Sequence, residues 1–259
     1  MLKQTLTFPQ IRQVCLSHTA FGATLPWLTP LLTCSSDWPT VAEINLAVKK
    51  ISLNFPWEFI LQEKVSRRAK SRGMGSLSNY LDLILAQGKV PVREKNIHDL
   101  LNALSFIMFP LSKAALNRRH HQESPEGLRP GQNRTRTQDH LTIFDEGGVI
   151  RLKYLDSHSE SKTDQSALEH DFIFGHAIFE HIIHDKELRA ARLDLSVSCG
   201  QEAFSQVDLT ANAESPAQNP TWPGIIKTTH QADIALSECL KNDQTFLSST
   251  EFAHLWINP

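Results

Sequence analysis

Apolar residues recur at helical spacing in several stretches of the chain. One helix is expected to run to about Lys50, capped by Asp37 or Thr40, because a stripe repeats every three or four residues at Val41, Ile44, Ala47, Val48 and Ile51. A second is expected over 78–87, with Gly88 at its C-cap. The stretch 97–109 is strongly amphipathic, and Pro110 separates it from a further helix over 111–121.

The hydrophobic period shortens after Gln138, which predicts strands. The apolar run 141–144, a turn over 145–148 and the run 149–154 together predict a β-hairpin. Residues 193–197 alternate like a further strand. Helices are expected over about 166–185 and 231–240, while loops are expected over 124–138 and 211–223. This pattern predicts a single α+β domain over residues 1–259, predominantly helical, with a β-hairpin and one or two further strands.

Composition and charge narrow the function classes. A net charge of −2 provides no global field to attract nucleic acid or anionic lipid, so any such binding would need a local patch. The four cysteines are widely spaced and include no Cys-x-x-Cys pair, which favours reduced thiols. The first ten residues lack a secretory pattern, and the longest apolar stretch, 103–111, is too short to cross a bilayer. We therefore expect a soluble, cytoplasmic protein without a membrane partner.

The densest group of polar residues lies at and after the start of the amphipathic helix over 97–109. His98 and Asn102 are one helical turn apart, and Lys113 and Asn117 repeat that spacing beyond Pro110. With Asp99, these residues would suit a general base, a carboxylate that orients it, and groups that hold an anion. The alternative is that they form the solvated face of the helix and cap its ends, with Asn96 as the N-cap.

Two further groups of residues could bind a ligand. Five arginines fall within nineteen residues and would suit an anionic small molecule or a nucleic-acid backbone, although a solvated, mobile loop is the favoured interpretation: Arg118, Arg119, Arg129, Arg134 and Arg136. His176, Glu180 and His184 recur every four residues and would present two imidazoles and a carboxylate to a divalent metal. A structural role, with His176 hydrogen-bonded in the interior, remains the alternative.

Several of these residues stand in motifs that resemble a known family. The stretch 88–104, followed by Phe109-Pro110, the run 113–117 and His120, is similar to the core of the bacterial domain-of-unknown-function family numbered 3025. Family members typically carry tryptophan where Ile97 and Phe106 stand here. The runs 139–148 and 174–180 also resemble family motifs, in the same order, so the family-like core covers about 78–185, and the segment 241–259 diverges.

The resemblance implies no known activity, but it adds to the candidate site. The polar positions of the family motifs correspond to residues that we expect to converge on one pocket: Arg93, Glu94, His98, Asp99, Asn102, Lys113, Asn117, Asp139, Asp145, His176 and Glu180.

The first functional hypothesis is a hydrolase-like or nuclease-like enzyme. In it His98 is the base, Asp99 orients it, and an anionic group binds to Asn102, Lys113 and Asn117. Arg93, Glu94, Arg118 and Asp139 would contact the substrate, while His176 and Glu180 would hold a divalent metal as cofactor.

Two other hypotheses compete with the enzyme. A binding protein would use the arginine-rich segment to meet an acidic partner or nucleic acid. A buried polar network that specifies the fold would also bring these residues together, but without a cavity. The position of the side chains, and the presence of a cavity among them, therefore discriminate between the three.

Overall fold

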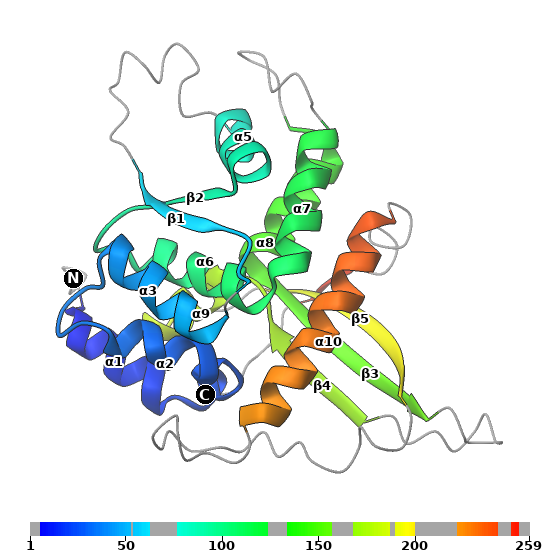
Figure 1. The fold of residues 1–259 in the computed structure, drawn as a ribbon. Helices are drawn as coiled ribbons and strands as arrows, with labels where there is room; N and C mark the ends of the chain where they lie inside the picture. The colour runs from blue at the N-terminus through cyan, green and yellow to red at the C-terminus, as the bar shows by residue number, and fades with distance from the viewer. Residues whose placement is uncertain are drawn as a thin grey trace.

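A computed structural model describes residues 6–52, 54–62, 77–123, 134–156, 168–186, 190–199, 222–242 and 250–253. The N-terminal part is helical, with α1 (Phe8–Ser17), the 3-10 helix η1 (Thr19–Thr24), α2 (Leu25–Thr33) and α3 (Val41–Ile51). The capping box of Thr40 and Glu43 begins α3, as the sequence predicts. These helices gather on one side of the molecule in Figure 1.

A small parallel sheet joins this part to the rest. It consists of β1 (Glu58–Leu61) and β2 (Lys89–Val92), which pair directly. Along the chain, α5 (Leu77–Gln87) lies between the two strands. The Asn45 side chain on α3 holds β1 by two hydrogen bonds, donating to the Phe59 carbonyl at 2.7 Å and accepting from the Phe59 amide at 3.0 Å. Gly88 ends α5 with a φ of 64°, the left-handed conformation that glycine tolerates.

Two central helices meet at a sharp bend. They are α6 (Ile97–Met108), capped by Asn96, and α7 (Pro110–Gln122), and their axes differ by 109°. Buried Asp233 caps the start of α7, where its carboxylate accepts hydrogen bonds from the amides of Leu111 and Ser112 at 3.0 and 2.8 Å. Both expected helices are thus confirmed.

The larger sheet has the strand order β4-β3-β5-β6. Its strands are β3 (Gly148–Asp156), β4 (Leu168–Ile173), β5 (Ala190–Cys199) and β6 (Thr250–Ala253), of which β3 and β5 run parallel. Ile150 and Leu152 of β3 are buried, while the alternate residues Arg151 and Lys153 form ion pairs with neighbouring strands. The long helix α10 (Trp222–Lys241) crosses in front of this sheet in Figure 1.

The α+β, mainly helical fold class is confirmed, but three local predictions are wrong. Residues 141–147 form the end of α8 (Arg136–Gly147) and not a hairpin arm, although β3 does pair antiparallel with β4. The helix expected over 166–185 is strand β4 followed by the short helix α9 (His176–Ile183). Helix α10 begins at Trp222, within the expected loop. Of the loop expected over 124–138, residues 124–133 lie outside the described residues, and residues 136–138 belong to α8 instead.

The core is continuous across these elements. Buried side chains from α1 through α10 form one hydrophobic cluster, in which Phe21 of η1 stacks on Phe179 of α9 with ring centroids 4.9 Å apart. Within the described helices, no single one is long and apolar enough to span a membrane, and the bent pair α6 and α7 passes such a test only jointly.

Candidate functional site

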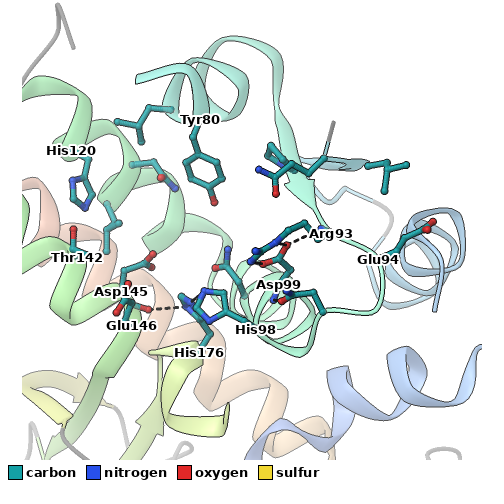
Figure 2. Close-up of a pocket in the computed structure, with 18 of the residues that line it drawn as sticks. Tyr80, Arg93, Glu94, His98, Asp99, His120, Thr142, Asp145, Glu146 and His176 are labelled. Atoms are coloured by element: carbon teal, nitrogen blue, oxygen red, sulfur yellow. Dashed lines mark hydrogen bonds and ion pairs between the residues drawn. The ribbon is translucent and has the colours of Figure 1, made fainter. Parts of the chain in front are cut away.

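A large cavity lies between α5, α6, α7, α8 and α9, with the segment 93–96 on its rim (Figure 2). Its volume is about 1350 Å³, which exceeds the roughly 300 to 1,000 Å³ of a typical small-molecule site. Eight of the eleven residues that the sequence indicated line it: Arg93, Glu94, His98, Asp99, Asn102, Asn117, Asp145 and His176. The expected convergence on one pocket is therefore largely realised.

Two histidines from distant parts of the chain meet at this cavity. The Nε2 atoms of His98 on α6 and His176 on α9 are 3.1 Å apart, and their rings are nearly perpendicular. Behind His98, its Nδ1 lies 3.0 Å from a carboxylate oxygen of Glu180. Behind His176, its Nδ1 lies 3.1 Å from the backbone carbonyl oxygen of Asp145.

The partners behind the rings determine where the ring hydrogens lie. A carbonyl oxygen can only accept a hydrogen bond, and so can an ionised carboxylate, so both Nδ1 atoms must donate. When both rings are neutral, each Nε2 therefore presents a lone pair to the other. The facing nitrogens repel unless a positive charge lies between them, and the smallest such charge is one proton, carried by one ring and accepted by the other.

A close approach of backbone to backbone fixes the position of His176. Gly175 is the N-cap of α9 and lies against the end of α8, so that an added Cβ atom would be 2.4 Å from the Glu146 carbonyl oxygen. Only glycine fits there without movement of one helix. Burial, reinforced by the nearby Lys113 ammonium, lowers the pKa of His176 to about 3, which keeps its ring neutral near pH 7.

Asp99 does not orient His98, contrary to the hypothesis. Its carboxylate oxygens accept hydrogen bonds from the Arg93 guanidinium at 2.6 and 2.8 Å and from the Arg93 amide at 2.7 Å. Adjacent residues on a helix point about 100° apart, so Asp99 turns away from the ring of His98. Glu180, suggested by the sequence as a metal ligand, is the carboxylate that contacts His98.

Lys113 is buried beneath the cavity floor instead of lining it. Its side chain is 1% exposed, and its ammonium donates to the Asp145 carboxylate at 2.5 Å and to the Asn102 side chain at 3.0 Å. Burial alone would favour protonation of Asp145, but the Lys113 ammonium outweighs it and lowers the pKa of that carboxyl. Asp145 therefore stays ionised and neutralises the lysine.

One face of α7 continues along the cavity with Asn117 and then His120, one turn later. Burial lowers the pKa of His120 to about 4. On the opposite wall, the ring of Tyr80 projects from α5 into the cavity in Figure 2. Burial raises the pKa of Tyr80, and the Asp145 carboxylate adds to this effect.

We did not predict Tyr80 as a site residue, because a single tyrosine in a helix has no distinguishing pattern. His120 could have been found from its spacing to Lys113 and Asn117.

Other predicted residues lie elsewhere. Arg118 and Asp139 are exposed and do not line the cavity, because they project from other faces of α7 and α8. Arg134, from the same basic segment as Arg118, does line it. The ring of His98 lies between Glu180 and His176, so these two do not form a shared site for a metal ion. Across the described residues, no group of three or more histidine, cysteine or acidic side chains is arranged to hold one.

Comparisons with known proteins place the chain in a family but indicate no activity for it. The model of a family described as protein of unknown function, DUF3025, matches residues 68–257. No curated protein and no solved structure matches the chain.

Proposed function

This chain belongs to the DUF3025 family, and from its cavity we propose that it is an enzyme of hydrolase type that works by general acid and base catalysis through His98 and His176. The observation that carries the proposal is the pair of facing Nε2 atoms at 3.1 Å, each backed by a hydrogen-bond acceptor at Nδ1. An arrangement of this kind takes up and releases one proton at a defined place in a cavity.

Glu180 determines which histidine holds that proton. Its carboxylate faces the Nδ1 of His98, where it stabilises an imidazolium, whereas His176 faces only a neutral carbonyl group and lies beside the Lys113 ammonium. The proton therefore resides on Nε2 of His98, and Nε2 of His176 accepts it as a hydrogen bond. Since the side chain of His98 is 38% exposed and lines the cavity, a substrate can reach it.

A reaction can be written from the ability of the histidine pair to take up and release one proton. In the unprotonated pair, Nε2 of His98 removes a proton from a water molecule, whose oxygen attacks an acyl or phosphoryl centre of the substrate. The bond to the leaving group breaks with its electron pair, and the leaving group takes the proton back from His98. The Arg93 nitrogen Nη1, which is not used in the pair with Asp99, would stabilise negative charge on the attacked group.

A panel of chromogenic substrates tests this proposal. Purified protein would be assayed with p-nitrophenyl acetate, bis(p-nitrophenyl) phosphate and amino-acid p-nitroanilides, beside His98→Asn and Glu180→Gln. We expect turnover of one class, lost by roughly 10²- to 10⁴-fold in His98→Asn. The matched control is His230→Asn, an exposed histidine on α10 outside the cavity.

Two results would contradict the proposal. Activity that is equal in wild type and His98→Asn would remove His98 from the chemistry, and no turnover in any class would favour the binding protein. Elemental mass spectrometry of the same samples separates the proton from a metal ion between the histidines: stoichiometric metal lost in His98→Asn or in His176→Asn would replace the shared proton by a cation.

A further inference from the structure

A buried nitrogen without a partner marks a second region of the cavity. His120 is 5% exposed, and among the described residues no donor or acceptor satisfies its Nδ1 atom. An unpaired buried polar atom destabilises the folded state, so a protein keeps one only where something compensates. Because this nitrogen is enclosed while the rest of His120 lines the cavity, a turn of the ring would present it to a bound molecule, which would supply that partner.

The groups around His120 are uncharged hydrogen-bonding groups. Asn117, one turn before it on α7, donates its Nδ2 to the Lys113 carbonyl at 2.7 Å, which leaves its side-chain oxygen as an acceptor. The Tyr80 phenol on α5 has a raised pKa and stays protonated, so it is available as a donor. Together these side chains offer both donors and acceptors, as an amide or a hydroxyl group requires.

The buried cation beneath the floor is already neutralised, which disfavours an anion there. Lys113 pairs with Asp145, whereas Arg93 lies on the rim, where its side chain is 54% exposed and pairs with Asp99. The charges that act on His120 are the Asp145 carboxylate, the Lys113 ammonium that pairs with it, and Arg134, so an anion there would lose its hydration without a free buried cation beside it. Arg134 also lines the cavity, but its side chain is exposed, so water screens its charge.

We propose that Tyr80, Asn117 and His120 form a subsite that binds an uncharged amide or hydroxyl group of the substrate, while the group to be attacked lies at His98. This inference rests on the proposed function and corrects the expectation of an anion bound by Asn102, Lys113 and Asn117. It assigns the substrate to a class with a neutral polar body, such as a peptide-like amide or a sugar.

Benzamide and benzoate test the subsite, because they have the same size and differ in charge. Each would be titrated into full-length protein with ¹⁵N-labelled histidine, while the ring nitrogens of His120 are followed by long-range ¹H–¹⁵N correlation. We expect benzamide to shift the His120 nitrogens saturably and benzoate to bind at least about tenfold more weakly. His120→Phe should weaken benzamide binding by about tenfold, which corresponds to one lost hydrogen bond.

The subsite is overturned if benzoate binds as tightly as benzamide, or if benzamide leaves the His120 nitrogens unshifted. Should His120→Phe fail to fold, Tyr80→Phe removes a single hydroxyl, and unchanged benzamide affinity in that variant would equally contradict the proposal. His98→Asn separates the two proposals: it should bind benzamide as the wild type does, since binding at the subsite does not need the reacting histidine.

Discussion

His98 and His176 are 78 positions apart in the chain, yet their Nε2 atoms face each other at 3.1 Å. Neither ring can rotate to relieve this contact without losing the acceptor behind it, Glu180 in one case and the Asp145 carbonyl in the other. The pair is therefore held in an arrangement that a positive charge between its members stabilises.

The first prediction concerns the tautomers of this pair. Both His98 and His176 should carry a hydrogen on Nδ1, with the additional proton at Nε2 of His98, because their Nδ1 partners only accept. Long-range ¹H–¹⁵N correlation of the wild type, assigned with His98→Asn and His176→Asn, measures this directly. A neutral His176 with its hydrogen on Nε2 would contradict the assignment.

The second prediction concerns the buried ion pair below the cavity. Lys113→Met leaves the Asp145 carboxylate without its cation and should lower the free energy of unfolding by about 3 to 5 kcal/mol in urea titrations. Lys113→Met with Asp145→Asn should recover most of that loss, because no unpaired charge remains. Lys153→Met is the matched control: it breaks partly exposed pairs with Asp194 and Glu169 and should cost less than about 1 kcal/mol. Equal losses in the two single variants would refute the argument.

The third prediction concerns the acid sensitivity that His120 confers. Its folded-state pKa of about 4 lies below the unfolded value of about 6.5, so the unfolded chain binds the proton first as the pH falls. The stability due to neutral His120 is thus complete above about pH 6.5 and is lost as the pH falls toward 4, by at most about 1.4 kcal/mol per pH unit.

His120→Asn should flatten the pH dependence of the free energy of unfolding within that window, as measured by urea titrations at half-unit steps. The exposed His230 provides the comparison, since His230→Asn should leave the wild-type slope unchanged. Parallel curves for wild type and His120→Asn would show that the buried ring does not contribute.

The fourth prediction concerns the glycine that sets the position of α9. Gly175→Ala forces a Cβ atom against the end of α8, and overpacking of this kind costs about 1 to 3 kcal/mol. Because His176 follows directly, the contact between the two Nε2 atoms should open, and activity should fall further than stability. Thermal unfolding measures the loss of stability, and the His176 nitrogen shifts report whether the contact between the two Nε2 atoms has opened. Ala177→Ser, one residue past His176, is the control and should change neither.

Local patterns predicted helices well where one face is apolar and a cap precedes it, as in α3 and α6. The region 141–147 was misassigned because β-branched and aromatic residues there favour a strand. Two other signals favour the helix: a capping box of Thr135 and Gln138, and burial of Leu141 and Phe144, three positions apart, while Ile143 between them is 47% exposed. Tertiary burial decided the outcome.

For the candidate site too, the sequence predicts local features better than contacts between residues that are far apart in the chain. Most of the residues that the sequence indicated do meet at the cavity, because ionisable side chains within helices are conspicuous. The sequence could not indicate which of them touch: the bond between His98 and Glu180 spans 82 positions and arises only when α6 and α9 pack. The neighbouring Asp99 was the nearer candidate along the chain and the wrong one in space.

The family model matches only part of the chain, whereas residues outside that part also contribute to the packed core. The family match begins at residue 68, yet Phe21 packs on Phe179, Trp57 packs on Phe106, and Asn45 holds β1 beside β2. A fragment cut at the family boundary would expose the aromatic rings of α6 and α9, the two helices that carry the facing histidines. The packed core thus extends beyond the part of the chain that the family model matches, and the positions of the two facing histidines depend on residues outside that part.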